Sequence, residues 1–311
     1  MESVPPEIWT DIFAFACTDD GSTGRALSTV SRAVHLASKP LKYQSICVVG
    51  PIQLRKLLTA LSALSPRARQ IKYLFVANLD ASIALDVGGP ESTTEIQRTP
   101  HADPDKAATT EEVVSTEEAL LRMLHLSSSS LVALHIHCTE IYRQSLLPEM
   151  TLPHLSELTL HSEFRSVQPT TRQPHALLPS LRRMRIHHFG YLPPDFLRQI
   201  AHAAPRLTHL RVPQRSVSPY TVQVALGLLQ GVAAAPACSL EEVVIELDPA
   251  PTSVCSWAGN IRAEQFLRKF RTIARGDKRV CLVDGRNGWM TVDEAKEGWL
   301  QDVCRLEGSR R

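Results

Sequence analysis

The sequence carries a recurring pattern of apolar positions in which two leucine-type residues three apart are followed, two residues later, by a third. The six clear copies begin at Ile71, Leu131, Leu155, Leu181, Leu207 and Leu240. From the second copy onward, the first positions are 24, 26, 26 and 33 residues apart. Since alternate side chains of a strand point to opposite faces, each copy predicts a short strand with one buried face.

Weaker copies of the pattern occur at both ends of this array. One lies at Tyr43, Ile46 and Val48, and the other around Val280 and Leu282. We expect both to be further strands, which extend the array toward each end of the chain.

Segments with helical periodicity separate the predicted strands. They cover residues 51–64, 115–126, 194–204, 220–235, 260–275 and 291–305. Several starts are well defined, with Pro51 in a first turn and with Ser115 and Glu118, or Thr291 and Glu294, at the spacing of a capping box. We expect all six helices on the outer, convex face of the array.

The alternation of strands and helices predicts an α/β fold over residues 48–311. A period near that of leucine-rich repeats, about 20 to 29 residues, favours a curved, leucine-rich-repeat-like solenoid in which stacked units share one core. The exception is 86–115, which is rich in Pro, Gly, Ser, Thr and acidic residues. That composition is typical of a disordered excursion.

The first 47 residues follow a different pattern. In the helix predicted over Val4–Ala16, Ile8, Ile12 and Phe15 form one apolar line, and a second apolar line lies beside it. A turn and more helical sequence follow, so residues 1–47 predict a three-helix domain. A unit of this size is marginal alone and should lean on a neighbour or a partner.

The stretches VPPEIWTDIF and LSTVSR resemble the F-box, in the order that this motif has. The resemblance implies binding of a Skp-type adaptor and, through it, a cullin and RING ubiquitin ligase. Carried over by position, the implied adaptor contacts are Pro5, Pro6, Glu7, Ile8, Ile12, Leu27, Val30, Ser31 and Arg32. The alternative is that the three helices merely cap the array that follows them.

Charge and cysteine content point to no special class of partner or compartment. The chain has 34 basic and 32 acidic side chains, a formal charge of +2, so its overall charge indicates neither nucleic acid nor a membrane surface. Seven scattered cysteines never occur as CxxC, which favours reduced thiols. We see no signal peptide or membrane-spanning stretch, and expect a cytoplasmic or nuclear protein.

Motifs for catalysis and cofactor binding are missing from the sequence. It contains no Walker A loop, GxGxxG, HExxH or GxSxG, so we expect no enzyme and no cofactor. His135 and His137 share a strand face and could place two imidazoles on one metal. Exposed histidines on a solvated concave face need no metal, and we expect none there.

The predicted concave face has a basic centre. From Leu181 to Arg215 there are seven arginines and one acid, Asp195. Because neighbouring strands lie about 4.8 Å apart, their side chains should form one patch. The predicted client-binding residues are His137, His161, Arg183, Arg185, His187, His209 and Arg211. We expect an acidic or phosphorylated client that binds more tightly in acid; the alternative is an ordinary solvated face.

These patterns favour a substrate-recruiting subunit of a Skp/cullin/F-box ubiquitin ligase in the ubiquitin conjugation pathway. The adaptor binds the N-terminal helices, and a client protein binds the concave repeat face. Two alternatives remain: a leucine-rich-repeat interaction scaffold without a ligase role, or a binder of nucleic acid or a phosphorylated ligand through the arginine and histidine patch.

Overall fold

The computed structural model of the 311-residue chain has a mixed α/β fold built on an eight-stranded parallel sheet. It describes residues 4–77, 115–137, 150–163, 177–188, 196–214, 239–247, 265, 268, 271–272, 274–284 and 290–308. None of the helices in these ranges is long and apolar enough to cross a bilayer.

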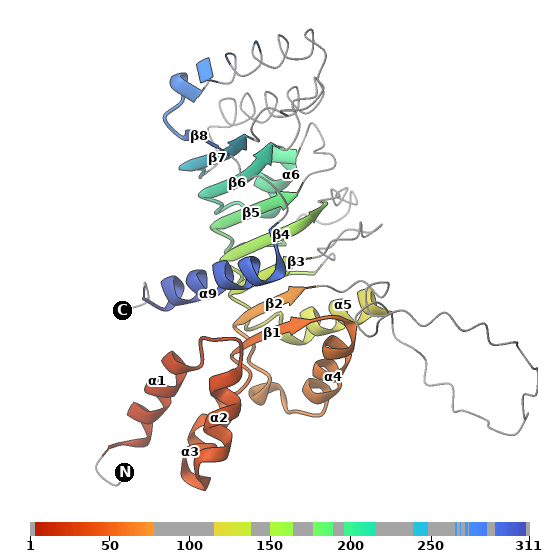
Figure 1. Cartoon of the computed structure of the whole chain (residues 1–311), viewed down its shortest axis with the longest axis vertical. Helices are drawn as coiled ribbons and strands as arrows, with labels where there is room; N and C mark the ends of the chain where they lie inside the picture. Colours follow the sequence, from red (N-terminus) through yellow and green to blue (C-terminus); the bar gives the residue numbers. More distant parts are fainter. Residues whose placement is uncertain are drawn as a thin grey trace, which may run out of the picture.

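Each strand of the sheet pairs with its neighbours in the chain, so the order in space is the order in sequence (Figure 1). The strands are β1 (Ser45–Val49), β2 (Tyr73–Ala77), β3 (Ala133–His137), β4 (Glu157–Glu163), β5 (Arg183–His188), β6 (His209–Gln214), β7 (Glu242–Leu247) and β8 (Val280–Asp284). The six clear copies of the apolar pattern are β2 to β7, and the two weaker copies are β1 and β8. The prediction of strands at all eight places is confirmed.

The register explains why the pattern repeats. Its middle apolar positions are paired across the sheet, from Leu74 and Leu134 through Leu158 and Met184 to Leu210. All these side chains are buried in one core with helices α4 (Pro51–Ser62), α5 (Thr116–Ser127) and α6 (Phe196–Ala203). We call this side of the sheet the helical face. Burial of one position in every strand fixes the register, because a slip of one residue would expose the whole row.

The helix starts follow the sequence signals. Pro51 is the first residue of α4, where its missing N–H leaves no bond unmade. The Ser115 hydroxyl accepts a hydrogen bond from the backbone N–H of Glu118 at 3.1 Å and so caps α5.

The C-terminal helix α9 (Val292–Gly308) lies on the opposite face of the sheet, which we call the α9 face. Expecting residues 291–305 on the same side as the other helices was therefore wrong. Ala295, Trp299 and Val303 form one stripe of α9, and they pack on Phe75 and its neighbours in β2 and β3. The α9 face is apolar at these two strands, so it needs a cover of its own.

Three short helices precede the sheet: α1 (Pro6–Ala16), α2 (Ser22–Val30) and α3 (Arg32–Ser38), with a 3₁₀ turn η1 (Lys39–Leu41) before β1. Hydrogen bonds join these helices to the edge of the sheet at the start of β1. The Gln44 side-chain amide donates to the Ala14 carbonyl at 2.8 Å, and the Ser45 hydroxyl donates to the Asp19 carbonyl.

Four expectations lie wholly or partly outside the described residues. These are the excursion at 86–115, of which only Ser115 is described, the first two residues of the helix at 194–204, the helix at 220–235, and part of the helix at 260–275. Within the last, residues 265, 268, 271, 272, 274 and 275 are helical.

Candidate functional site

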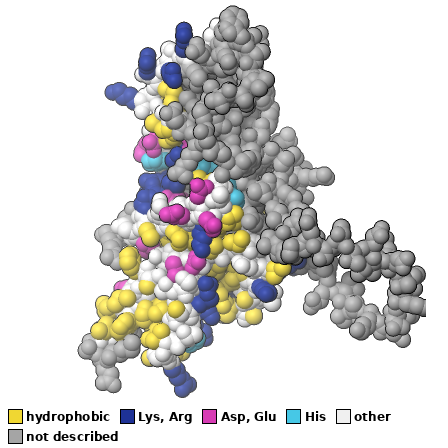
Figure 2. Space-filling view, in the orientation of Figure 1, with side chains coloured by type: hydrophobic (Ala, Val, Ile, Leu, Met, Phe, Trp, Pro, Cys, Tyr) yellow, Lys and Arg dark blue, Asp and Glu magenta, His cyan; other side chains and the backbone are white. Residues whose placement is uncertain are grey.

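The N-terminal helices expose a concentration of large apolar side chains. Among the described residues, seven large hydrophobic side chains are exposed, and six of them precede residue 37. These six, which we call the N-terminal apolar patch, are Val4, Ile8, Ile12, Phe15, Val30 and Leu36. Figure 2 shows hydrophobic side chains gathered at the end of the molecule that α1 occupies. An apolar surface of this kind marks an interaction site in a folded protein.

The patch arises because α1 has two apolar sides and uses only one of them for packing. Phe13 and Cys17, one turn apart, are buried, and Trp9 contacts Phe13 with ring centroids 5.5 Å apart. Ile8 and Ile12, on the other side, stay 47% and 49% exposed.

The turns between the helices hold the patch in place. Asp19 accepts bonds from the backbone N–H groups of Gly21 and Thr23 and from the Ser22 and Thr23 hydroxyls. Burial raises the pKa of Asp19, but these bonds outweigh it and leave the pKa below its ordinary value. At the next junction, the Ser31 hydroxyl caps α3 by accepting from the Val34 N–H at 3.2 Å.

Most of the implied adaptor contacts are exposed. The exposed members are Pro5, Glu7, Ile8, Ile12, Val30, Ser31 and Arg32, while Leu27 is half-buried and Pro6 is the first residue of α1. The structure thus places them at the start of α1 and around the junction of α2 and α3.

The α9 face carries a row of aromatic rings from four strands and α9. Trp299 contacts Phe75 at 5.5 Å between ring centroids, and Phe75 contacts His135 at 5.0 Å. His161 stacks on His135 at 4.7 Å and on His187 at 4.1 Å. We call these five residues the aromatic row.

Three histidines of this face are buried, contrary to the expectation of a solvated concave surface. His135, His137 and His161 are only 5 to 6% exposed. The segment leading into α9 contributes to this cover, since His137 Nε2 lies 3.0 Å from the Met290 carbonyl. A carbonyl only accepts, so this nitrogen carries the proton. In the described part of the chain, His135 Nε2 and His137 Nδ1 have no hydrogen-bond partner.

Burial keeps His135 uncharged. It is the main reason why the pKa of His135 is well below its ordinary value, and electrostatic interactions with His187, His137 and Arg185 lower this pKa further.

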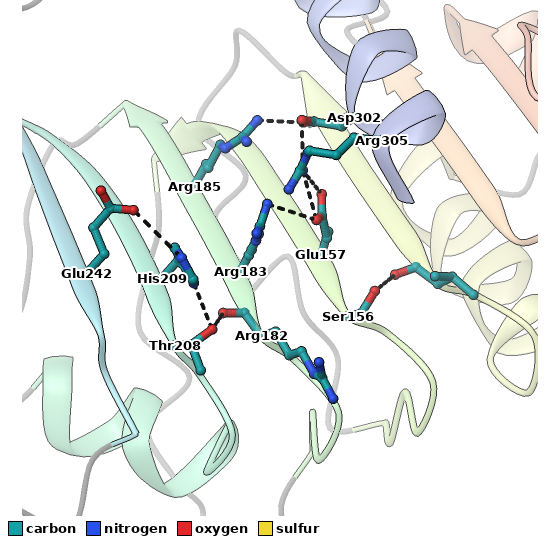
Figure 3. Close-up of polar contacts among 11 residues, drawn as sticks. Ser156, Glu157, Arg182, Arg183, Arg185, Thr208, His209, Glu242, Asp302 and Arg305 are labelled. Atoms are coloured by element: carbon teal, nitrogen blue, oxygen red, sulfur yellow. Dashed lines mark hydrogen bonds and ion pairs between the residues drawn. The ribbon is translucent and has the colours of Figure 1, made fainter. Parts of the chain in front are cut away.

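Ion pairs link α9 to the strands next to this row (Figure 3). Arg185 pairs with Asp302 at 2.5 Å, and Arg305 pairs with Glu157 at 2.8 Å and with Asp302 at 3.0 Å. Arg183 lies 3.9 Å from Glu157 on the neighbouring strand. Burial raises the pKa of both Glu157 and Asp302, and the arginines beside them oppose the rise.

The basic side chains of β6 that belong to the predicted client-binding set also lie beside carboxylates, in this case from β7. Arg211 forms an ion pair with Glu246, and His209 lies 3.8 Å from Glu242. The count of seven arginines and one acid along the sequence therefore overstated the positive charge, because the carboxylates beside Arg183, Arg185 and Arg211 come from neighbouring strands and from α9.

The seven predicted client-binding residues do come together on one face. The pairs His137 and His161, Arg183 and His209, and Arg185 and Arg211 are each in register on adjacent strands, and His187 stacks on His161. They differ in access, however. His137 and His161 are buried, while the side chains of Arg183, His209 and Arg211 are 37%, 34% and 44% exposed.

The histidines are poorly placed to share a metal ion. Imidazole lone pairs lie in the ring plane, and His161 stacks nearly parallel to both His135 and His187, at 15° and 9°. No group of three or more metal-ligating side chains occurs among the described residues.

Sequence reasoning missed the α9 residues Trp299, Asp302 and Arg305. A signal for their position was present: Phe75 and Ala77 occupy strand positions that were expected to face solvent, and they are apolar.

No family model matches the chain, and no match is found among curated proteins or solved structures. The N-terminal apolar patch and the α9 face are therefore the features from which a function can be inferred.

Proposed function

We propose that this chain is a substrate-recruiting subunit of a Skp/cullin/F-box-type ubiquitin ligase, acting in the cytoplasm or nucleus. In this proposal the N-terminal helices bind a Skp-type adaptor, and the α9 face of the sheet binds a client protein. Ubiquitin transfer is carried out by other subunits.

The observation that carries the proposal is the N-terminal apolar patch. Outside it, the described residues expose one large hydrophobic side chain, Ile52 on α4. Burying the patch against a partner removes apolar surface from water, at about 25 cal/mol per Å². The patch also coincides with the stretches VPPEIWTDIF and LSTVSR, which resemble the F-box.

The arrangement of the chain also supports the proposal. Three short helices followed by strands stacked in chain order are what an F-box domain and a leucine-rich-repeat-like solenoid would give. In this proposal residues 1–47 form the first and residues 48–311 the second.

For the client we propose contacts to Arg183, His209 and Arg211, whose side chains are 37%, 34% and 44% exposed. Arg185, at 31%, is paired with Asp302 of α9. Each lies near a carboxylate, so the exposed surface has mixed charge. A mixed surface favours a protein client over nucleic acid, whose recognition needs uncompensated cations. A purely structural scaffold would share this surface but not bind the adaptor.

The test is co-purification of the full chain with a Skp-type adaptor. Replacing Ile8 and Ile12 together by Asp puts two unpaired charges into the apolar contact. Desolvating them costs several kcal/mol, roughly enough to abolish co-purification.

The matched control is Ile52→Asp, a change of the same kind at an exposed apolar residue outside the patch. This variant should bind as the unchanged chain does. Circular dichroism should show that all variants keep their helix content. Binding that survives both substitutions in α1 would rule out the proposed adaptor site. Point substitutions are preferable to a truncation at Gly50, which would also remove β1 from the sheet.

A further inference from the structure

We infer that α9 is a displaceable occupant of a docking site for an amphipathic helix, and that a client binds the α9 face by putting such a helix in its place. This inference rests on the proposed function only in assigning the incoming helix to a client.

The floor of the site is formed by β2 and β3. Tyr73, Phe75 and Ala133 are buried there against Ala295 and Trp299 of α9. Trp299 is 1% exposed, so the floor accepts a large aromatic side chain. The α9 stripe continues to Val303, and positions four residues apart lie on one side of a helix. The floor therefore recognises a helix with a narrow apolar stripe.

Charged groups beside the floor fix the register and direction of the bound helix. Asp302, three residues after Trp299, meets Arg185 of β5, and Arg305 meets Glu157 of β4. Glu307 hydrogen-bonds Tyr73 at the start of β2, whereas Met290 contacts His137 at the end of β3. The helix thus runs antiparallel to the strands. The matching ligand has an acidic residue one turn after its central apolar anchor.

The core of the sheet does not depend on α9. The apolar residues of the helical face form one cluster with α4, α5 and α6, and the α9 side chains belong to a separate cluster on the other face. Loss of α9 would leave the first cluster intact. It would expose Tyr73 and Phe75, so the bare floor favours another helix over water.

The contact between α9 and the sheet also buries polar atoms that lack hydrogen-bond partners. These atoms weaken the binding of α9 to the sheet. In the described part of the chain Trp299 Nε1, His135 Nε2 and His137 Nδ1 are buried without a hydrogen-bond partner. Each such atom carries a desolvation penalty that the contact does not recover. Trp299 Nε1 leaves with α9, so a ligand that supplies hydrogen-bond partners to the His135 and His137 nitrogens would bind more tightly than α9 does.

This arrangement extends the set of client contacts. Arg185 becomes available to a client carboxylate once Asp302 has left, and the covered His137 and His161 come to face the incoming helix. The seven predicted client-binding residues then form one surface in the client-bound state.

The test uses a fluorescent synthetic peptide of residues 290–308, titrated with the full chain. The unchanged chain should bind the peptide weakly, because its own α9 occupies the floor. A full chain with Trp299→Ala should bind it about tenfold or more tightly, because its own helix competes less well. Ile52→Asp, which lies away from the floor, should leave the affinity unchanged.

A charge exchange then tests the register. The peptide with Asp302→Lys should bind the Trp299→Ala chain roughly 10- to 100-fold more weakly, the range for losing one partner of a charge-assisted pair. Adding Arg185→Glu to that chain should restore binding of this peptide. The inference would be overturned if a folded Trp299→Ala chain did not bind the peptide. It would also be overturned if Arg185→Glu did not restore binding of the Asp302→Lys peptide.

Hydrogen exchange on the unchanged chain gives an answer that does not depend on a variant folding. Backbone amides of residues 292–308 should exchange faster than those of β2 and β3, through an opening that keeps the strands protected. Equal protection in α9 and the strands would show that α9 opens only together with the strands. This result would overturn the inference. Both measurements are independent of the adaptor, so failure of adaptor binding would leave their outcome unaffected.

Discussion

At the scale of single residues, His135 is the most constrained group on the α9 face. It lies between Phe75 and His161, with Arg185 among the charges that act on it. A proton added there would bring a charge into a buried site that also contains Arg185. His135 is therefore uncharged at neutral pH and a source of instability in acid.

His135 gives the first stability prediction. Its pKa in the folded chain is lower than the ordinary 6.5, so below that pH the unfolded chain binds a proton that the folded chain does not. The free energy of unfolding should therefore fall as pH drops below 6.5. His135→Phe removes this contribution. At one pH unit below 6.5, the substitution should raise the free energy of unfolding by about 1 kcal/mol, relative to its effect at neutral pH.

Urea denaturation at several pH values measures the effect. His125→Phe, the same substitution at an exposed position of α5, is the control. If the His135→Phe profile is unchanged, His135 does not titrate differently in the folded and unfolded chain.

At the scale of elements, α9 is held by buried ion pairs as well as by its apolar stripe. The Glu157 and Asp302 side chains are 10% and 14% exposed, and Arg305 bonds both. Such a pair adds little net stability once desolvation is counted, but removing its cation leaves two carboxylates close together. The contact therefore depends strongly on one guanidinium group.

Arg305→Met should lower the free energy of unfolding by about 1 to 3 kcal/mol near neutral pH, less than for a fully buried pair because Arg305 is a third exposed. The loss should shrink as the pH falls, because burial raises the pKa of Glu157 and Asp302 and protonation relieves their repulsion.

Arg122→Met is the matched control for this prediction. Arg122 pairs with Glu118 on the surface of α5, with the two side chains 56% and 49% exposed, and its loss should have little effect. Equal losses for the two variants, or a loss at Arg305 that grows in acid, would contradict the buried-pair account.

The strands could be predicted from the sequence, whereas the position of α9 was indicated only by the apolar residues Phe75 and Ala77. A strand signal is local: the positions of Leu74 and Val76 alone define a buried side. A helix such as α9 shows by its pattern which of its sides is apolar, but not which face of the sheet that side will meet. The decisive fact is tertiary, since Phe75 and Trp299 lie far apart in the sequence and close in space.

The charge on the α9 face was misjudged for a related reason. Arg211 and its partner Glu246 are 35 residues apart, and Arg185 and Asp302 are 117 apart. A window along the chain counts such arginines without the carboxylates that neutralise them. The N-terminal apolar patch, in contrast, could be predicted from the helical period of Ile8 and Ile12.

At the scale of the whole molecule, α9 joins parts that are distant in the sequence. Lys296 pairs with Asp20, in the turn between α1 and α2, at 2.8 Å, and Asp302 pairs with Arg185 of β5. The helix thus contacts both the N-terminal helices and the middle of the sheet. A change near Asp20 and a change near Arg185 can therefore both act on α9.

The segment 86–115 gives a prediction at this scale, made from its composition alone. Its residues cannot bury enough apolar surface to offset the entropy of ordering, so limited proteolysis should cut there first. A deletion should stop before Ser115, because that residue caps α5. Removal of residues 86–114 should change the free energy of unfolding by less than about 1 kcal/mol. Protection from protease, or a large loss of stability, would reveal an ordered element.

Because the chain is synthesised from its N-terminus, β2 and β3 are made well before the helix that covers them. Tyr73 and its partner Glu307 are 234 residues apart. A ribosome that adds about 5 to 20 residues per second needs roughly 10 to 50 s to cover that distance. During this interval β2 and β3 can already pair, but their apolar floor has no helix of its own chain to cover it. Every nascent copy therefore presents an open binding site to chaperones and partners before its own helix can compete.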